Sequence, residues 1–223
     1  MISQLFWHLD APDERLAKEA PDTNYEKVIC PADPEHQRAG KRISNLSVIL
    51  DSRGVRDFTW TWFSDILVSR KVLDLFKKYR VTGYETAPAK ASYRTGIQVR
   101  PPDLFELVVT GWGGWAAPAA SVRLESSCPA CGDKEYLITN PTRLIDPAAW
   151  DGSDLFIVWP LPRFRFASSR LASILRKENV SGVKLVPAAK IPLERGETVG
   201  PASITYWMPE GRARELGQRF GIS

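Results

Sequence analysis

Residues 69–89 read SRKVLDLFKKYRVTGYETAPA, and residues 168–188 read SSRLASILRKENVSGVKLVPA. The second stretch matches the first at an offset of 99 residues without a gap, and serine, lysine, valine, glycine and proline recur at the same places. A recurring order of residues at a constant offset is the sequence signature of a repeated structural unit. The alignment therefore predicts an internal duplication, in which one unit occurs twice in the chain.

Each copy has the pattern of a helix followed by a strand. Ser69 and Ser168 are N-cap candidates, because a serine hydroxyl can accept a hydrogen bond from a free first-turn N–H. Apolar residues follow at helical spacing in both copies. Gly83 and Gly182 then mark the end of each helix and the start of an extended run.

Further strand candidates flank the two helices. They are rich in aromatic and β-branched residues, and they lie at 58–63, 104–110, 155–159 and 204–207. In this alignment Trp60 corresponds to Trp159, and the segment 104–110 corresponds to 204–207. The pattern predicts an α+β fold of two similar strand–helix–strand lobes with mixed or antiparallel sheets.

The duplication also suggests a domain organisation. We expect an N-terminal lobe over 1–115 and a C-terminal lobe over 116–223, packed either as two lobes or as one compact pseudo-symmetric domain. The repeat is open to two interpretations. It is either architecture alone, or it forms a cleft or a shared metal site between the lobes.

The composition is that of a globular protein. Of the 223 residues 43% are hydrophobic and 25% are charged, which argues against extensive disorder. No apolar run approaches the roughly 18 residues that a membrane span needs, and the first ten residues, MISQLFWHLD, do not read as a secretory signal. We therefore expect a soluble cytoplasmic protein without a membrane partner.

Two of the three cysteines lie in a zinc-knuckle motif, Cys128-Pro129-Ala130-Cys131-Gly132. Two cysteines three residues apart on a tight turn can direct both thiolates at one ion, and the glycine permits the left-handed backbone that follows. The first half of the chain carries a related sequence, in which Cys30-Pro31-Ala32 is followed by Asp33 and, three residues later, by His36. An odd number of cysteines also fits metal or free-thiol chemistry better than a disulfide framework.

Three interpretations of these cysteines are open. In the first, Cys30, Cys128, Cys131 and either Asp33 or His36 form a closed, structural zinc site between the two copies. In the second, the thiols bind no metal. In the third, Cys128 and Cys131 are a redox pair, although such pairs usually stand at the start of a helix and residues 135–137 read as a strand.

The stretch Trp112-Gly113-Gly114-Trp115 reads as a flexible turn that carries two large apolar rings. If the rings are exposed, Trp112 and Trp115 are the best candidates for a partner-binding surface, since desolvated tryptophan often dominates binding energy. If they are buried, they fill the space between the lobes.

An enzymatic role is not indicated. The chain has two histidines, so the most common general base is scarce, and it contains no nucleophile elbow, phosphate loop or His-Glu-x-x-His motif. Nucleic-acid binding is the alternative to protein binding, because zinc knuckles and aromatic rings can hold single strands. The basic residues are scattered, however, and the net charge is +4. The alternation Arg163-Phe164-Arg165-Phe166 is also typical of a half-buried strand with its charges outward.

At the CPACG of residues 128–132 and the Cys-Pro at 30–31, the chain resembles the double-CXXCG motif family of bacterial proteins. That family includes immunity proteins that neutralise toxins exchanged between neighbouring cells, and it is best known from myxobacteria. The likeness covers residues 25–190, and the chain departs from the family pattern where Asp33 replaces the second cysteine of the first motif. The resemblance implies an immunity protein that binds and blocks a cognate protein toxin. Because the chain is basic, with a pI of about 9.0, we expect an acidic or apolar contact surface on that toxin.

Overall fold

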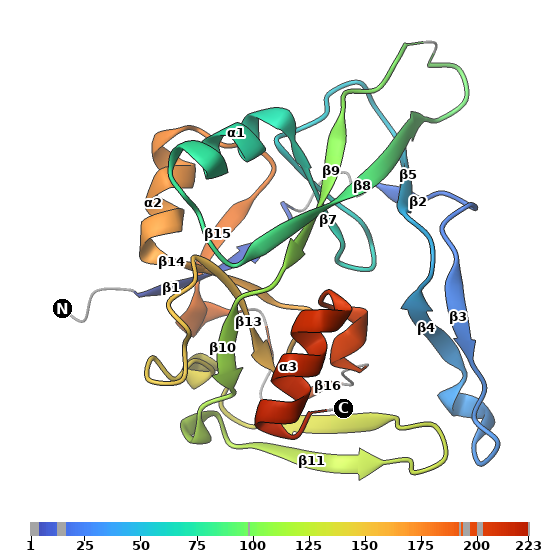
Figure 1. Ribbon diagram of the computed structural model, residues 1–223, viewed down its shortest axis with the longest axis vertical. Coiled ribbons are helices and arrows are strands. Elements are labelled where there is room, and N and C mark those ends of the chain that lie inside the picture. Colours follow the sequence, from blue (N-terminus) through green and yellow to red (C-terminus); the bar gives the residue numbers. More distant parts are fainter. Residues whose placement is uncertain are drawn as a thin grey trace.

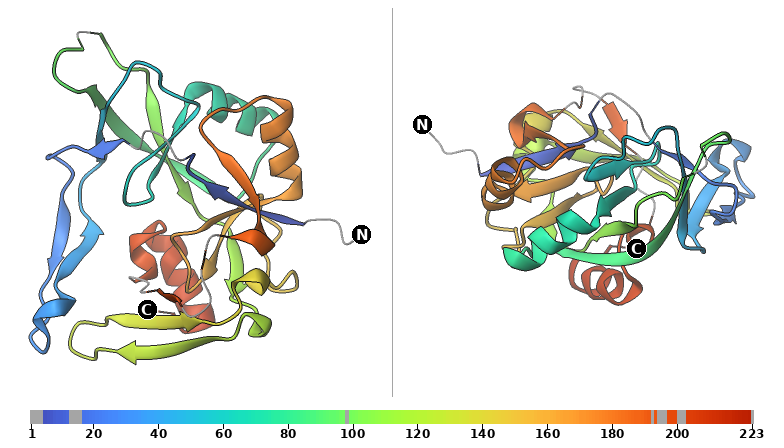
Figure 2. Two further views of the ribbon diagram at one scale, coloured as in Figure 1. Left: turned by 180° about the vertical axis from the view of Figure 1, so that it is seen from behind. Right: turned by 90° about the horizontal axis from the view of Figure 1, so that it is seen from above.

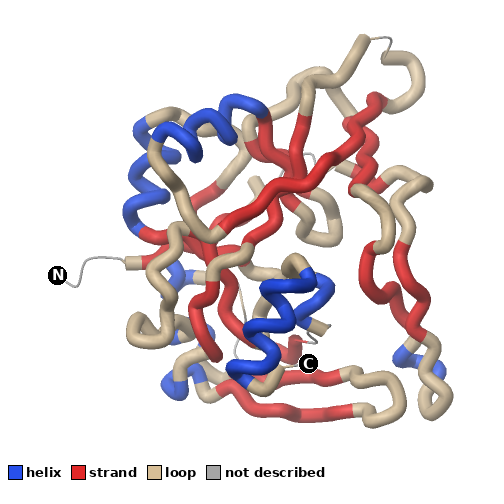
Figure 3. The backbone as a smooth tube through the Cα atoms, in the orientation of Figure 1, coloured by secondary structure: helices blue, strands red, loops and turns tan. Residues whose placement is uncertain are grey.

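The computed structural model describes residues 5–12, 17–97, 99–191, 193, 197–199 and 203–222 (Figure 1). Strands dominate, in both parallel and antiparallel pairs, and three α-helices accompany them in the described part of the chain (Figure 3). The predicted α+β class with mixed sheets is confirmed.

Two larger sheets carry most of the chain. The six-stranded sheet runs in the order β2 (Lys18–Glu19), β5 (Leu46–Leu50), β8 (Tyr84–Tyr93), β9 (Leu104–Val109), β7 (Ile66–Ser69) and β6 (Phe58–Trp60). The five-stranded sheet runs in the order β10 (Trp112–Trp115), β13 (Leu155–Trp159), β14 (Arg165–Ser168), β1 (Phe6–Asp10) and β15 (Lys184–Pro187). One pair in each sheet is parallel, β5 with β8 and β10 with β13, and the other pairs are antiparallel.

Two smaller sheets lie at the periphery, as the views of Figure 2 show. One is the hairpin of β3 (Tyr25–Val28) and β4 (Arg38–Arg42), and the other contains β11 (Val122–Ser127), β12 (Lys134–Ile138) and β16 (Glu197–Val199). The α-helices are α1 (Arg70–Lys78), α2 (Ser169–Lys177) and α3 (Glu210–Phe220). Short 3₁₀-helices are η1 (Pro34–His36), η2 (Pro118–Ala120), η3 (Pro141–Arg143), η4 (Ala188–Lys190) and η5 (Ile204–Tyr206).

Helices α1 and α2 form where the two aligned stretches predict them. Ser168 caps α2 by accepting a hydrogen bond from the backbone N–H of Leu171 at 3.1 Å, whereas the Ser69 hydroxyl is directed to Asp57 at 3.3 Å. Each helix buries one apolar face in the same large core cluster. The helices lie side by side (Figure 1), and Tyr79 at the end of α1 hydrogen-bonds the Glu178 carboxylate at the end of α2.

The two helical units contact each other through reciprocal hydrogen bonds. Asp57 precedes β6, and its carboxylate accepts from the backbone N–H of Ser181, just after α2, at 2.9 Å. Asp154 precedes β13, and its carboxylate accepts from the backbone N–H of Thr82, just after α1, at 3.1 Å. Each unit therefore anchors the helix-to-strand turn of the other.

The glycine that ends each helix fits against the partner unit. Gly83 and Gly182 have φ of +82° and +80°, a left-handed backbone that favours glycine. A Cβ on Gly83 would lie 2.0 Å from the carbonyl oxygen of Leu155, and a Cβ on Gly182 would lie 2.1 Å from that of Phe58. Both turns are thus restricted to glycine by backbone conformation and by close approach.

The strand order of the two units also matches, but the second unit takes its middle strand from the start of the chain. The strands on either side of α1 are separated in the sheet by β9, and the strands on either side of α2 are separated by β1. The registers agree, because Pro88 pairs with Phe105 and Pro187 pairs with Trp7. The first strand of the chain therefore completes the second unit, and the boundary at residue 115 does not divide the sheets. Descent of the two units from one copied segment stays a prediction.

Three of the sequence-based predictions were wrong. Residues 204–206 form the 3₁₀-helix η5 rather than a strand, and β1 occupies the place that was assigned to them. Residues 112–115 form strand β10 rather than a flexible turn. Trp60 corresponds to Ile157 and not to Trp159, because the second hairpin is two residues longer. The strand pairs that fix this correspondence are Phe58 with Val68 and Leu155 with Ala167.

The five-stranded sheet separates two core clusters. Alternate residues of β13 point to opposite sides, so that Leu155 and Ile157 join the cluster shared with α1 and α2, while Phe156 and Val158 join a second cluster. Burial on both faces explains the unbroken apolar run of this strand. A third cluster packs on the six-stranded sheet around Leu46 and Leu67. In the part of the chain that the structure describes, no helix has the length and hydropathy that crossing a bilayer requires.

Candidate metal centre

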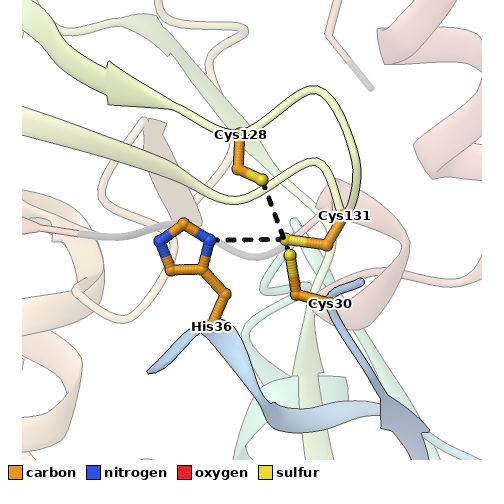
Figure 4. Close-up of side chains that lie close together, drawn as sticks. All are labelled: Cys30, His36, Cys128 and Cys131. Atoms are coloured by element: carbon orange, nitrogen blue, oxygen red, sulfur yellow. Dashed lines mark hydrogen bonds between the residues drawn. The ribbon is translucent and has the colours of Figure 1, made fainter. Parts of the chain in front are cut away.

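Four side chains with metal-binding atoms meet between the two peripheral sheets. Cys30 and His36 come from the connection between β3 and β4, and Cys128 and Cys131 come from the turn between β11 and β12 (Figure 4). The sulfur atoms and the ring nitrogen all lie within 4.8 Å of one another. Segments 98 residues apart in the sequence thus converge on one point.

The spacing of these atoms suits a tetrahedral ion. The sulfur atoms of Cys30 and Cys128 lie 3.7 Å apart, and the Cys131 sulfur lies 3.8 Å from Nδ1 of His36. A tetrahedron with metal–sulfur bonds of about 2.3 Å has edges of about 3.8 Å. The two distances match such edges, so the side chains need little movement to coordinate one ion.

Backbone geometry holds the knuckle in shape. The carbonyl of Cys128 accepts from the N–H of Gly132 at 2.8 Å, and the N–H of Cys128 donates to the carbonyl of Asp133 at 2.8 Å. Gly132 has a φ of +72°, the left-handed conformation that the sequence motif predicts. The tight turn brings both sulfur atoms to the same side.

Asp33 is placed behind His36 rather than among the four converging side chains. One of its carboxylate oxygens lies 3.5 Å from Nε2 of His36, while Nδ1 of that ring faces the sulfur atoms. The other oxygen caps η1 by accepting from the N–H of Glu35 at 2.9 Å. Of the two candidates for the fourth position, the geometry selects His36. Asp33 lies where a carboxylate fixes the tautomer and orientation of a metal-binding histidine.

Arg38 is a component of the site that the sequence did not indicate. Its guanidinium lies 3.6 Å from the Cys131 sulfur, donates to the Cys131 carbonyl at 3.2 Å and pairs with Asp133 at 3.2 Å. Three thiolates around a divalent cation leave one negative charge in excess. The nearby guanidinium can offset this charge.

The thiols differ in acidity. The backbone N–H of Cys131 and the His36 ring lower the pKa of Cys128 to about 6. Arg38 lowers the pKa of Cys131, whereas burial raises the pKa of Cys30. The lowered pKa values of Cys128 and Cys131 favour the thiolate form, which is the form that binds a metal.

The two partner-binding candidates have different environments. Trp112 is 2% exposed and packs against Phe220 of α3, with ring centroids 5.3 Å apart. Trp115 is 41% exposed and meets Trp159 edge-on. Gly113 between them is required, because a Cβ there would lie 2.6 Å from the Phe156 ring. Of the pair, only Trp115 presents a substantial surface to a partner.

The outer carboxylate is open to a direct test. If the four side chains hold a zinc ion, replacing Asp33 with alanine should weaken its binding about 10- to 100-fold, as does the loss of other carboxylates that hydrogen-bond a metal-binding histidine. Competition with a chromophoric chelator measures this affinity. Glu35→Ala is the matched control, because Glu35 lies in the same turn and its side chain is not among those that meet at the site. Equal affinities for the two variants would show that Asp33 does not support the site.

Comparison with known proteins adds no relative: no protein-family model matches the chain, and no curated protein sequence matches it.

Proposed function

We propose that the chain is an immunity-type binding protein, held in shape by a structural zinc ion, that neutralises a cognate bacterial protein toxin by direct contact. The observation that carries the proposal is the convergence of the two Cys-Pro segments, at 30 and 128, on one three-cysteine, one-histidine group. These two segments are also the features by which the chain resembles the double-CXXCG immunity proteins.

Zinc is the ion that this set of ligands favours. Thiolate and imidazole ligands in a tetrahedral arrangement are typical of structural zinc sites, whereas Mg²⁺ and Ca²⁺ prefer oxygen. A site with four protein ligands is closed, so it has no open position for a substrate. Its role is therefore to join the β3–β4 hairpin to the β11–β12 hairpin.

Joining the β3–β4 hairpin to the β11–β12 hairpin would help the protein to bind a partner. The β3–β4 hairpin extends along one side of the molecule, well separated from the α1–α2 pair (Figures 1 and 2). Anchoring its tip reduces the conformational entropy that a partner must remove on association. The proposed zinc ion thus orders the surface around the β3–β4 hairpin before a partner binds.

The contact surface is proposed to include Trp115. A half-exposed tryptophan on a rigid strand is a typical centre of binding energy. The buried Trp112 and the two glycines hold this strand in place. The net charge of +4 favours a partner whose contact surface is acidic or apolar.

Protein binding is preferred here to single-stranded nucleic acid binding. Phe166 is fully buried and Arg165 is 8% exposed, so the 163–166 alternation does not form an open platform of rings and charges. The exposed charge that remains in this stretch is Arg163. A filter-binding assay with single-stranded DNA and RNA distinguishes the two roles, because phosphate-driven affinity falls steeply with salt.

Co-expression with the product of the adjacent gene tests the proposal. We expect a stable complex and relief of the growth arrest that the neighbouring protein causes alone. Trp115→Ala should weaken the complex about 30-fold, as expected for a residue worth about 2 kcal/mol. Trp62→Ala is the matched control, since Trp62 is a 71% exposed tryptophan on the β6–β7 turn. Absence of both complex and relief would remove the main support for an immunity role.

A further inference from the structure

A large cleft opens between the β3–β4 hairpin and the body of the molecule. Its volume is about 740 Å³, within the range of roughly 300–1,000 Å³ that is typical of small-molecule sites. Its walls come from β4, from the adjoining strands β8 and β9, and from the segments 160–165 and 205–209. The hairpin that closes one side lies at the edge of the molecule in Figure 1 and in both views of Figure 2.

Arg165 is the unusual residue of this cleft. It lies on β14, it is 8% exposed, and its guanidinium stands 5.1 Å from the ring centre of Trp207. Its hydrogen bond within the described chain goes to the carbonyl of Pro162, which is neutral. No carboxylate of a described residue lies within 4.0 Å of it, so no direct ion pair balances its charge there.

Arg165 stays charged despite its burial. Desolvation by burial lowers its pKa to about 10, which still leaves the guanidinium protonated at neutral pH. Asp65 and Glu106 attract the guanidinium from beyond ion-pair distance, and a bound anion in direct contact would further offset the cost of its burial. Stacking on an aromatic ring orients the guanidinium but does not neutralise it.

The other charges of the cleft are mostly paired. Arg42 forms an ion pair with Glu106, and Arg38 pairs with Asp133 at 3.2 Å. Among the lining residues that the structure describes, five are basic and four are acidic. Arg165 is therefore the buried cation of the cleft that lacks a carboxylate at ion-pair distance among the described residues, so a single ligand carboxylate could pair with it.

Most of the remaining wall is apolar, and hydroxyl groups come from Tyr25, Ser44, Thr86, Thr205 and Tyr206. Ile66, Leu107, Val109, Leu161 and Met208 line the cleft around the charged residues. Trp207 adds a flat ring, and its indole N–H has no hydrogen-bond partner within the described residues. A ligand that fits these walls has an apolar or aromatic body.

We propose that this cleft is a binding site for a small organic carboxylate, whose head group pairs with Arg165 and whose apolar body lies against Trp207 and the neighbouring aliphatic side chains. A guanidinium presents parallel N–H donors that match the two oxygens of a carboxylate. A phosphate monoester carries up to two negative charges and would need a second unpaired cation at the same depth. The proposal is independent of toxin binding.

Titration with a matched pair of compounds tests the site in the full-length protein. The probes are 3-phenylpropionate and 3-phenylpropionamide, which share a body and differ in charge, and binding is followed through the indole N–H signals in ¹H–¹⁵N spectra. The Trp207 signal is assigned from its loss in Trp207→Phe. We expect the carboxylate to shift this signal saturably and to bind at least about tenfold more tightly than the amide, as a charged hydrogen bond predicts.

Variants and a second anion sharpen the test. Arg165→Gln should abolish the preference for the acid, whereas Arg163→Gln, an exposed neighbour in the same cleft, should retain it. The spectrum of each variant reports whether the variant folds. If Arg165→Gln does not fold, the comparison of acid and amide binding to the wild-type protein still tests the proposal. Equal binding of acid and amide, no saturable shift of Trp207, or tighter binding of phenyl phosphate than of 3-phenylpropionate would each overturn the proposal.

Discussion

Replacing Cys131 with serine should lower the melting temperature of the protein by about 10–20 °C and abolish the proposed zinc binding. A structural zinc ion can contribute about 10 kcal/mol or more where folding depends on it entirely. Here the three core clusters pack around other residues, so we expect about half of that value. For a domain of this size, about 5 kcal/mol corresponds to 10–20 °C at roughly 2–4 °C per kcal/mol. Differential scanning calorimetry measures the change.

Two controls separate the effect of losing the metal from the effect of the substitution itself. Ser127→Ala, beside the knuckle on β11, is the matched control and should melt like the wild type, because Ser127 is exposed. A strong chelator should lower the melting temperature of the wild type to that of Cys131→Ser and should leave the variant unchanged. If the purified wild-type protein contains no metal and Cys131→Ser melts at the same temperature as the wild type, the structural role of the ion is refuted.

Gly182→Ala and Gly83→Ala should each destabilise the protein by about 2–5 kcal/mol. A non-glycine residue in the left-handed region costs about 1–2 kcal/mol, and forcing an atom into a filled space adds about 1–3 kcal/mol. In both variants the new Cβ would meet a backbone carbonyl of the opposite unit at 2.0–2.1 Å, and a backbone cannot swing aside as a side chain can. Urea unfolding monitored by circular dichroism gives the difference.

Gly152→Ala is the control for backbone strain. Its φ of +85° is equally unfavourable for alanine, but nothing lies within 4 Å of the new Cβ. The stability of Gly152→Ala should therefore fall only by the cost of backbone strain, about 1–2 kcal/mol. Similar losses in all three variants would mean that the two units do not fit together as closely as Gly83 and Gly182 indicate.

The repeated part of the fold could be predicted from the sequence because its information is local. Helical spacing, a serine at the start and a glycine at the end fix α1 and α2, and each signal lies within about ten residues of its effect. The exchange of β1 could not be predicted. The letters of residues 6–10 are compatible with a strand, but they do not say that its partners lie near 167 and 186.

Two errors in the alignment have different causes. A constant offset cannot register a change in loop length, so Trp60 was matched with Trp159 although the strand pairing places Ile157 there. The apolar residues 204–207 resembled a strand by composition, yet they turn into η5 and lead to α3. Short apolar segments are ambiguous, because packing rather than propensity decides their conformation.

The candidate site was partly predictable. The motif at 128–132 and the repeat together indicated Cys30, and His36 followed as one of two choices. The sequence could not decide between Asp33 and His36, since that depends on how η1 turns the ring toward the sulfur atoms. Arg38 and Arg165 were not predicted as site residues, because the role of each arises from contacts with residues distant in the sequence.

X-ray absorption at the zinc edge of the purified protein tests the central claim most directly. If one zinc ion is held by Cys30, His36, Cys128 and Cys131, the spectrum contains about three sulfur neighbours at about 2.3 Å and one nitrogen at about 2.0 Å. His36→Ala should replace the nitrogen with a solvent oxygen and retain the three sulfur atoms. Protein without stoichiometric zinc, or zinc surrounded only by nitrogen and oxygen, would contradict the account.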